Sequence, residues 1–153
     1  MKKILFVIIL SCILIVTSCK KSNSNAGSWS FEGVNYSAAN TTFTNTALTA
    51  TSGAATNRGS TLTFVFPAQT IRSATYQVVN YTSLPLDSNQ LYIQFINSST
   101  SFYYFSTGSD SVNAKVTVSS AGRVSVSVPS VYLKSYSAAI SDSGQLTATI
   151  NQQ

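Results

Sequence analysis

Alternation of apolar and polar residues in the C-terminal half of the chain is the feature that most constrains its fold. The apolar residues of a first run are Val112, Ala114, Val116 and Val118, and those of a second run, after Ala121-Gly122, are Val124, Val126 and Val128. Side chains two residues apart share one face of a β-strand. Because the intervening residues are polar, the two runs predict a hairpin with one buried and one solvent-facing side.

The same period of two recurs from residue 28 to the C-terminus, interrupted by turn residues at the short intervals typical of sandwiches and barrels. An opening hairpin is predicted with Trp29 and Phe31 on one strand and Val34 and Tyr36 on the next. Further predicted strands cover 41–51, 61–66, 74–80, 91–97, 102–106 and 145–150, with a short edge strand at 131–136. The pattern predicts an all-β domain over 28–153, an antiparallel β-sandwich of about nine to eleven strands, with a closed β-barrel as the alternative.

Charge is scarce in this chain. Charged residues make up 8% of it, against about 25% in a typical soluble domain, and Ser, Thr and Asn take their place. A surface that is polar through hydroxyls and amides is typical of β-rich proteins outside the cytoplasm. The net charge is +5 and its cations are scattered, so we predict no nucleic-acid partner.

The N-terminus has the parts of an export signal. Lys2 and Lys3 precede an apolar run of thirteen residues, 4–16, which is shorter than the roughly 20 residues of a spanning helix. The following Val16-Thr17-Ser18-Cys19 resembles the lipobox of bacterial lipoproteins. This resemblance implies a signal-peptide helix at 1–18, cleavage between Ser18 and Cys19, and membrane attachment through lipid on Cys19.

The lipoprotein prediction changes what the rest of the sequence means. Removal of 18 of the 153 residues leaves 135, and the loss of Lys2 and Lys3 lowers the net charge from +5 to +3. Cys12 lies within the apolar run and is interpreted as part of it. With Cys19 acylated, no thiol remains for a disulfide or a metal. Residues 19–27 are Ser/Asn-rich and predict a flexible tether.

The order of features along the whole chain is similar to that of small lipoproteins of Bacteroidota. These features are the lipobox, Lys20-Lys21 and a polar tether, then Trp29-x-Phe31-x-Gly33-x-x-Tyr36, alternating hairpins, and a terminal Gly144-x-Leu146-x-Ala148. The resemblance implies a lipid-anchored protein of the cell envelope, at the outer membrane. Because Lys20 and Lys21 stand where acidic residues signal surface export in some Bacteroidota, the periplasmic face is favoured over the cell surface.

Residues suited to catalysis are few. The chain has no His, which removes imidazole-based triads and metal sites. Its acidic residues are Glu32, Asp87, Asp110 and Asp142, which are far apart in sequence and lie mostly in predicted turns, where Asp side chains bind nearby backbone amides. We therefore predict no catalytic residue, no metal site and no cofactor.

Aromatic residues are the candidates for binding. Rings with hydroxyl tips stack on the apolar faces of sugars, and the neighbouring Asn, Gln and Ser can bind the sugar hydroxyls. The candidates are the run Phe102-Tyr103-Tyr104-Phe105 together with Trp29, Tyr92, Tyr132 and Tyr136. Of these, the predicted glycan-binding residues are Trp29, Tyr92, Tyr103, Tyr104 and Tyr132. Core packing is the alternative role for these rings. A third hypothesis is a structural or interaction module that docks an envelope protein, with 41–51 as the edge strand for pairing.

One modification sequence is also present. Asp110-Ser111-Val112 resembles the Asp-Ser/Thr-aliphatic acceptor of O-glycosylation in Bacteroidota. The resemblance implies a glycan on Ser111, in a predicted turn.

Overall fold

A computed structural model describes residues 26–53, 59–136 and 142–153, and they form ten β-strands. The strands are β1 (Gly27–Phe31), β2 (Val34–Thr44), β3 (Ala47–Ser52), β4 (Thr61–Val65), β5 (Ala74–Val78), β6 (Gln90–Asn97), β7 (Phe102–Ser106), β8 (Asn113–Val118), β9 (Val124–Ser135) and β10 (Ser143–Asn151). The all-β prediction is confirmed, with a strand number inside the predicted range. The predicted signal-peptide helix, Ser18 and Cys19 lie outside the described residues. Within the described part of the chain, no helix has the length and apolarity to cross a membrane.

The ten strands belong to one sheet whose hydrogen-bonded pairing closes on itself. One continuous circuit runs β10–β1–β2–β3–β4–β6–β7–β9 and returns to β10. Strands β5 and β8 complete the sheet between β6 and β9. The pairings are antiparallel as predicted, except that β5 and β6 are parallel at Gln77–Val78 and Gln90–Leu91. The long connection after β5 permits this exception, because a parallel neighbour cannot be reached through a tight hairpin.

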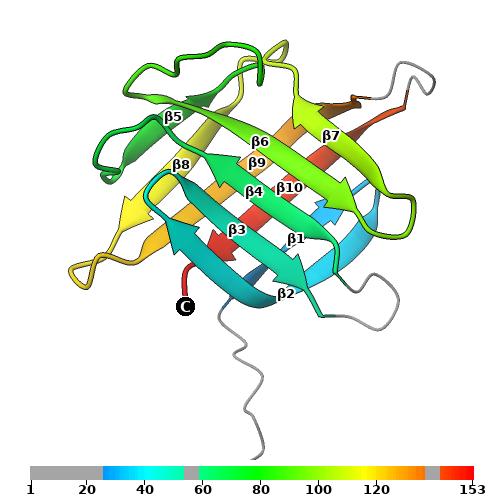
Figure 1. The fold of residues 1–153 in the computed structure, drawn as a ribbon, viewed down its shortest axis with the longest axis horizontal. Helices are drawn as coiled ribbons and strands as arrows, with labels where there is room; N and C mark the ends of the chain where they lie inside the picture. Colours follow the sequence, from blue (N-terminus) through cyan, green and yellow to red (C-terminus); the bar gives the residue numbers. More distant parts are fainter. Residues whose placement is uncertain (1–25, 54–58, 137–141) are drawn as a thin grey trace, which may run out of the picture.

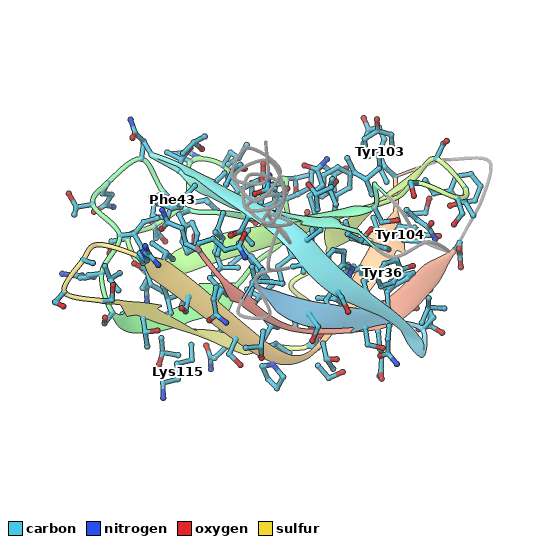
Figure 2. The ribbon with its side chains drawn as sticks, turned by 90° about the horizontal axis from the view of Figure 1, so that it is seen from below. Tyr36, Phe43, Tyr103, Tyr104 and Lys115 are labelled. Carbon is cyan, nitrogen blue, oxygen red and sulfur yellow. The ribbon has the colours of Figure 1, made fainter. Side chains whose placement is uncertain are left out.

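The closed sheet is flattened into two layers. In Figure 1, β3, β4 and β6 cross in front of β8, β9 and β10. Figure 2 shows Tyr36 and Tyr104 between the layers, whereas Tyr103 and Lys115 point outward on opposite surfaces. The architecture therefore combines the two packed layers of the predicted sandwich with the closed pairing of its alternative.

Alternating side chains from both layers fill the core, as the sequence pattern predicts. Leu62 and Phe64 on β4, and Ile93 and Phe95 on β6, have no exposed surface. Phe31 packs against Phe95, with ring centroids 4.9 Å apart. Burial of each such side chain contributes about 1.5–3 kcal/mol, which is the main source of stability available to this domain.

The first hairpin forms as predicted, but it begins earlier than expected. Ala26 is fully buried and Gly27 is already in β1, although both were predicted to belong to the tether. Gly27 has a φ of +93°, and a Cβ there would lie 2.0 Å from the carbonyl oxygen of Thr149. Only glycine permits this close approach of β1 to β10. At the turn, Glu32 and Gly33 both have positive φ, the requirement of a two-residue type I′ hairpin.

The predicted edge strand at 131–136 is instead the second half of β9. A bulge at Pro129–Ser130 shifts the register against β10 by one residue, so that Leu146 pairs with Val131 and Ala148 with Val128. Both Pro129 and Ser130 are exposed. Because a bulge accommodates proline inside a strand, β9 continues past it, with β10 on one side and β7 on the other.

The predicted Thr-rich strand at 41–51 is a hairpin. It comprises the end of β2, a turn, and β3, with Phe43 opposite Leu48. Strand β3 pairs with β2 on one side and β4 on the other. The β3 half is therefore not an edge, so the segment is not the single edge strand predicted.

Candidate ligand-binding surface

Four aromatic side chains gather on the outer surface of β7 and the end of β9, and we call them the aromatic patch: Tyr81, Tyr103, Phe105 and Tyr136. Residues of β7 alternate between inward and outward, so Tyr103 and Phe105 face outward while Tyr104 is buried. The amide of Tyr136 donates to the carbonyl of Tyr103 over 2.9 Å, which places these two residues opposite each other on neighbouring strands.

Ring contacts join three of the four residues, Tyr81, Phe105 and Tyr136. The ring centroids of Tyr81 and Phe105 lie 4.5 Å apart. Tyr136 approaches both at 5.9 Å, with interplanar angles of 80° to Tyr81 and 70° to Phe105. Edge-to-face contacts of this kind contribute about 0.5–1.5 kcal/mol beyond burial. Tyr136 nevertheless remains 68% exposed and Tyr103 50% exposed, so two rings are open to a ligand.

Buried hydrogen bonds fix the loop that carries Tyr81. The Ser106 hydroxyl donates to the carbonyl of Val79 over 2.6 Å and accepts from the amide of Ile93 over 3.0 Å. One residue later, Asn80 Nδ2 donates to the carbonyl of Thr107 over 3.2 Å. These bonds attach the loop to the end of β7, immediately before Tyr81.

A hollow of about 250 Å³ lies beside the patch. Its lining includes Tyr81, Phe105 and Tyr136, together with the polar side chains of Asn80, Thr107 and Lys134. Flat rings next to an amide, a hydroxyl and an ammonium group suit a ligand that has both apolar faces and many hydroxyls, such as a sugar.

Two of the predicted glycan-binding residues lie in the core. Trp29 and Tyr104 are each only 2% exposed. The Trp29 ring stacks on Tyr36 at 5.2 Å, and its Nε1 is buried without a hydrogen-bond partner among the described residues. Both rings follow the inward alternation of β1 and β7. They cannot stack on a ligand at the surface, so the core-packing alternative holds for this pair.

The other predicted rings lie on the outer surface. Tyr103 belongs to the aromatic patch. Tyr132 is 39% exposed two residues before Lys134, and its hydroxyl hydrogen-bonds the Ser143 hydroxyl. Tyr92 is half-buried, opposite Val65 on β4. Of the five predicted rings, the structure thus places one in the patch, two elsewhere on the outer surface and two in the core.

Phe105 and Tyr136 were aromatic candidates outside the five predicted residues, and Tyr81 was not a candidate. Phe105 has the same outward parity as Tyr103 in β7. Tyr136, the residue after the end of β9, is exposed with the same parity as Lys134. Tyr81 has no local signal, since a long-range hydrogen bond through Ser106 brings its loop to β7.

Three of the four carboxylates bind backbone amides. Glu32 Oε1 accepts from Gln145 N over 2.5 Å, and Asp142 Oδ1 accepts from Ser143 N over 2.9 Å. Asp110 Oδ2 accepts from the amide of Tyr132 over 2.8 Å. Tyr132 lies on β9 between the part that pairs with β8 and the part that pairs with β7. Among the described residues, no three His, Cys, Asp or Glu side chains gather in a group suited to a metal ion.

The structure places Ser111, the predicted O-glycosylation residue, in the loop between β7 and β8. Ser111 is exposed and has a φ of +52°. Its hydroxyl is therefore at the surface, as an acceptor requires, and its modification remains a prediction.

The chain was compared with known protein families, curated proteins and solved structures. No family model, no curated protein and no solved structure matches it. The residues of the aromatic patch are accordingly the basis for a functional proposal.

Proposed function

We propose that this chain is a lipid-anchored protein of the bacterial cell envelope that binds a glycan without catalysis. The observation that carries the proposal is the aromatic patch, in which the exposed Tyr136 lines the hollow together with Asn80 and Lys134, and the exposed Tyr103 lies opposite Tyr136. Tyrosine gives a large, rigid contact area at a low cost in side-chain entropy, together with a hydroxyl that can hydrogen-bond. The anchor part rests on the lipobox-like sequence ending at Cys19, and the periplasmic face of the outer membrane is the favoured location.

A carbohydrate array tests the glycan part. Full-length protein in lipid nanodiscs should bind a subset of glycans, and the double variant Tyr103→Ala/Tyr136→Ala should lose that binding. Lys115→Ala is the control, because Lys115 is exposed on the opposite outer surface (Figure 2). No glycan bound, together with capture of an envelope protein that requires Tyr103 and Tyr136, would instead support the interaction-module hypothesis.

Incorporation of a labelled fatty acid tests the anchor. The label should enter the wild-type chain and the Cys12→Ala variant but not Cys19→Ala, and only Cys19→Ala should leave the membrane fraction. Two chains on one residue hold a protein firmly, since each buried CH₂ contributes about 0.8 kcal/mol. Label retained in Cys19→Ala would refute acylation at this residue.

A further inference from the structure

A second, larger hollow opens at one end of the flattened sheet. Its volume is about 720 Å³, and it lies where the β2–β3 turn, the segment after β4 and the β8–β9 turn meet. Figure 2 shows Phe43, which lines it, toward the opposite end of the long axis from Tyr36 and Tyr104. It is therefore separate from the aromatic core around those residues.

The lining combines apolar with uncharged polar residues and contains no charged residue. Of the apolar lining residues, Val124 is buried, and Phe43, Ile71 and Val118 are half-buried. The remaining lining residues are small or uncharged polar: Asn45, Thr46, Ala68, Gln69, Thr70 and Gly122. Apolar side chains left half-exposed in a concave site favour an apolar ligand. Because the lining carries no charge, a charged group of the ligand would have no partner inside the hollow.

The chain enters the domain beside this hollow. The carbonyl of Ala26, the first described residue, accepts from Asn151 N over 3.0 Å. The next residue, Gln152, donates its amide to the carbonyl of Val124 over 2.8 Å and accepts from Val124 N through Oε1 over 2.9 Å. In Figure 1 the C-terminus accordingly lies close to the start of β1, on the side of the β8–β9 turn. Ala26 is thus connected to the wall of the hollow through neighbouring backbone hydrogen bonds.

Cys19 lies seven residues before Ala26, a separation of at most about 25 Å in a fully extended chain. Lipid on Cys19 therefore keeps this end of the domain near the bilayer. Two of the four cationic residues in the described part of the chain, Arg72 and Arg123, are exposed and directly adjoin the lining residues Ile71 and Val124 in sequence. Basic residues near anionic headgroups contribute about 1 kcal/mol each.

We propose that this end of the domain rests on the membrane and that the hollow accepts one acyl chain of a neighbouring phospholipid. The inference rests on the proposed anchor at Cys19 and not on glycan binding. Binding is non-covalent: the acyl chain contacts Phe43, Ile71 and Val118, while the headgroup stays outside, near Arg72 and Arg123.

Photo-crosslinking in membranes tests this inference. Cells producing the full chain are fed a diazirine fatty acid that enters their phospholipids, are illuminated, and the adducts are mapped by mass spectrometry. Phospholipid adducts should fall on the peptides that contain Phe43, Ile71 and Val118. Ile71→Asp should lower them at least fivefold, whereas Thr117→Asp, at an exposed position next to Val118, should leave them unchanged.

The other outcomes separate this inference from the anchor. The same spectra report whether Cys19 is acylated. An acylated Cys19 with no adduct at the hollow overturns the inference alone, and an unacylated Cys19 with no adduct overturns the anchor as well. A crosslink between the hollow and the Cys19 peptide contradicts the assignment to a neighbouring lipid, because the occupant would then be the protein's own acyl chain.

Discussion

The Tyr104 hydroxyl donates a hydrogen bond of 2.6 Å to Asp142 Oδ2, which joins the aromatic core to the residue before β10. Burial of the ring, together with the hydrogen bond and the negative charge of Asp142, raises the pKa of Tyr104. Burial also raises the pKa of Tyr36. The folded state therefore binds the phenolic protons more tightly than the unfolded chain does.

The raised pKa values predict alkaline destabilisation. Stability from these two groups is complete below the unfolded tyrosine pKa of about 10 and is lost as the pH rises further. Tyr104→Phe should lower the free energy of unfolding at neutral pH by about 1 kcal/mol and should flatten its decline above about pH 10. Urea unfolding at several pH values measures both effects, with Tyr103→Phe as the control for loss of an exposed hydroxyl. An equally steep decline in Tyr104→Phe would contradict the assignment.

Gly27 and Gly122 both have positive φ, but they differ in the room available for a side chain. A Cβ at Gly27 would lie 2.0 Å from a backbone oxygen, whereas a Cβ at Gly122 would have no neighbour within 4 Å. Gly122→Ala should therefore cost about 1 kcal/mol from backbone strain alone, and Gly27→Ala about 3 kcal/mol or more, because β1 must move away from β10. Equal losses in thermal unfolding would show that the contact between Gly27 and β10 is not tight.

The buried Ser106 hydroxyl contributes to the stability of the domain and also to the position of the loop that carries Tyr81. Ser106→Ala leaves a buried carbonyl at Val79 and a buried amide at Ile93 without their hydroxyl partner, which should cost about 2 kcal/mol. Because the loop that carries Tyr81 is attached through Val79, the variant should also weaken glycan binding. Ser127→Ala, at an exposed position on β9, should change the free energy of unfolding by less than about 0.5 kcal/mol. Unchanged glycan affinity in a destabilised Ser106→Ala would show that the Ser106–Val79 hydrogen bond is not needed to hold Tyr81 in the site.

Local alternation was enough to predict the all-β class and most strands, because parity alone assigns each side chain to the core or the solvent. The hairpin of β8 and β9 buries Val116 and Val126 and exposes Lys115 as expected. The exceptions depend on non-local contacts. The bulge at Pro129 joins two predicted strands into one, and the parallel pairing of β5 with β6 requires the chain to return from a long loop.

The candidate site was predictable only where a single strand determined it. Tyr103 was found from the aromatic run of β7, but the same run could not distinguish exposed Tyr103 from buried Tyr104 without knowledge of which face meets the core. Tyr81 joins the patch through the Ser106–Val79 hydrogen bond, which links residues 27 positions apart. No sequence window around Tyr81 contains that information.

The central claim, that the aromatic patch binds a glycan by stacking, is tested most directly by calorimetric titration of the best array glycan into full-length protein in nanodiscs. Tyr136→Ala should weaken binding about tenfold or more, which corresponds to about 1.4 kcal/mol. Tyr136→Phe keeps the ring and should stay within about threefold of wild type, and Lys115→Ala should match wild type. Equal affinity for wild type and Tyr136→Ala would contradict the claim.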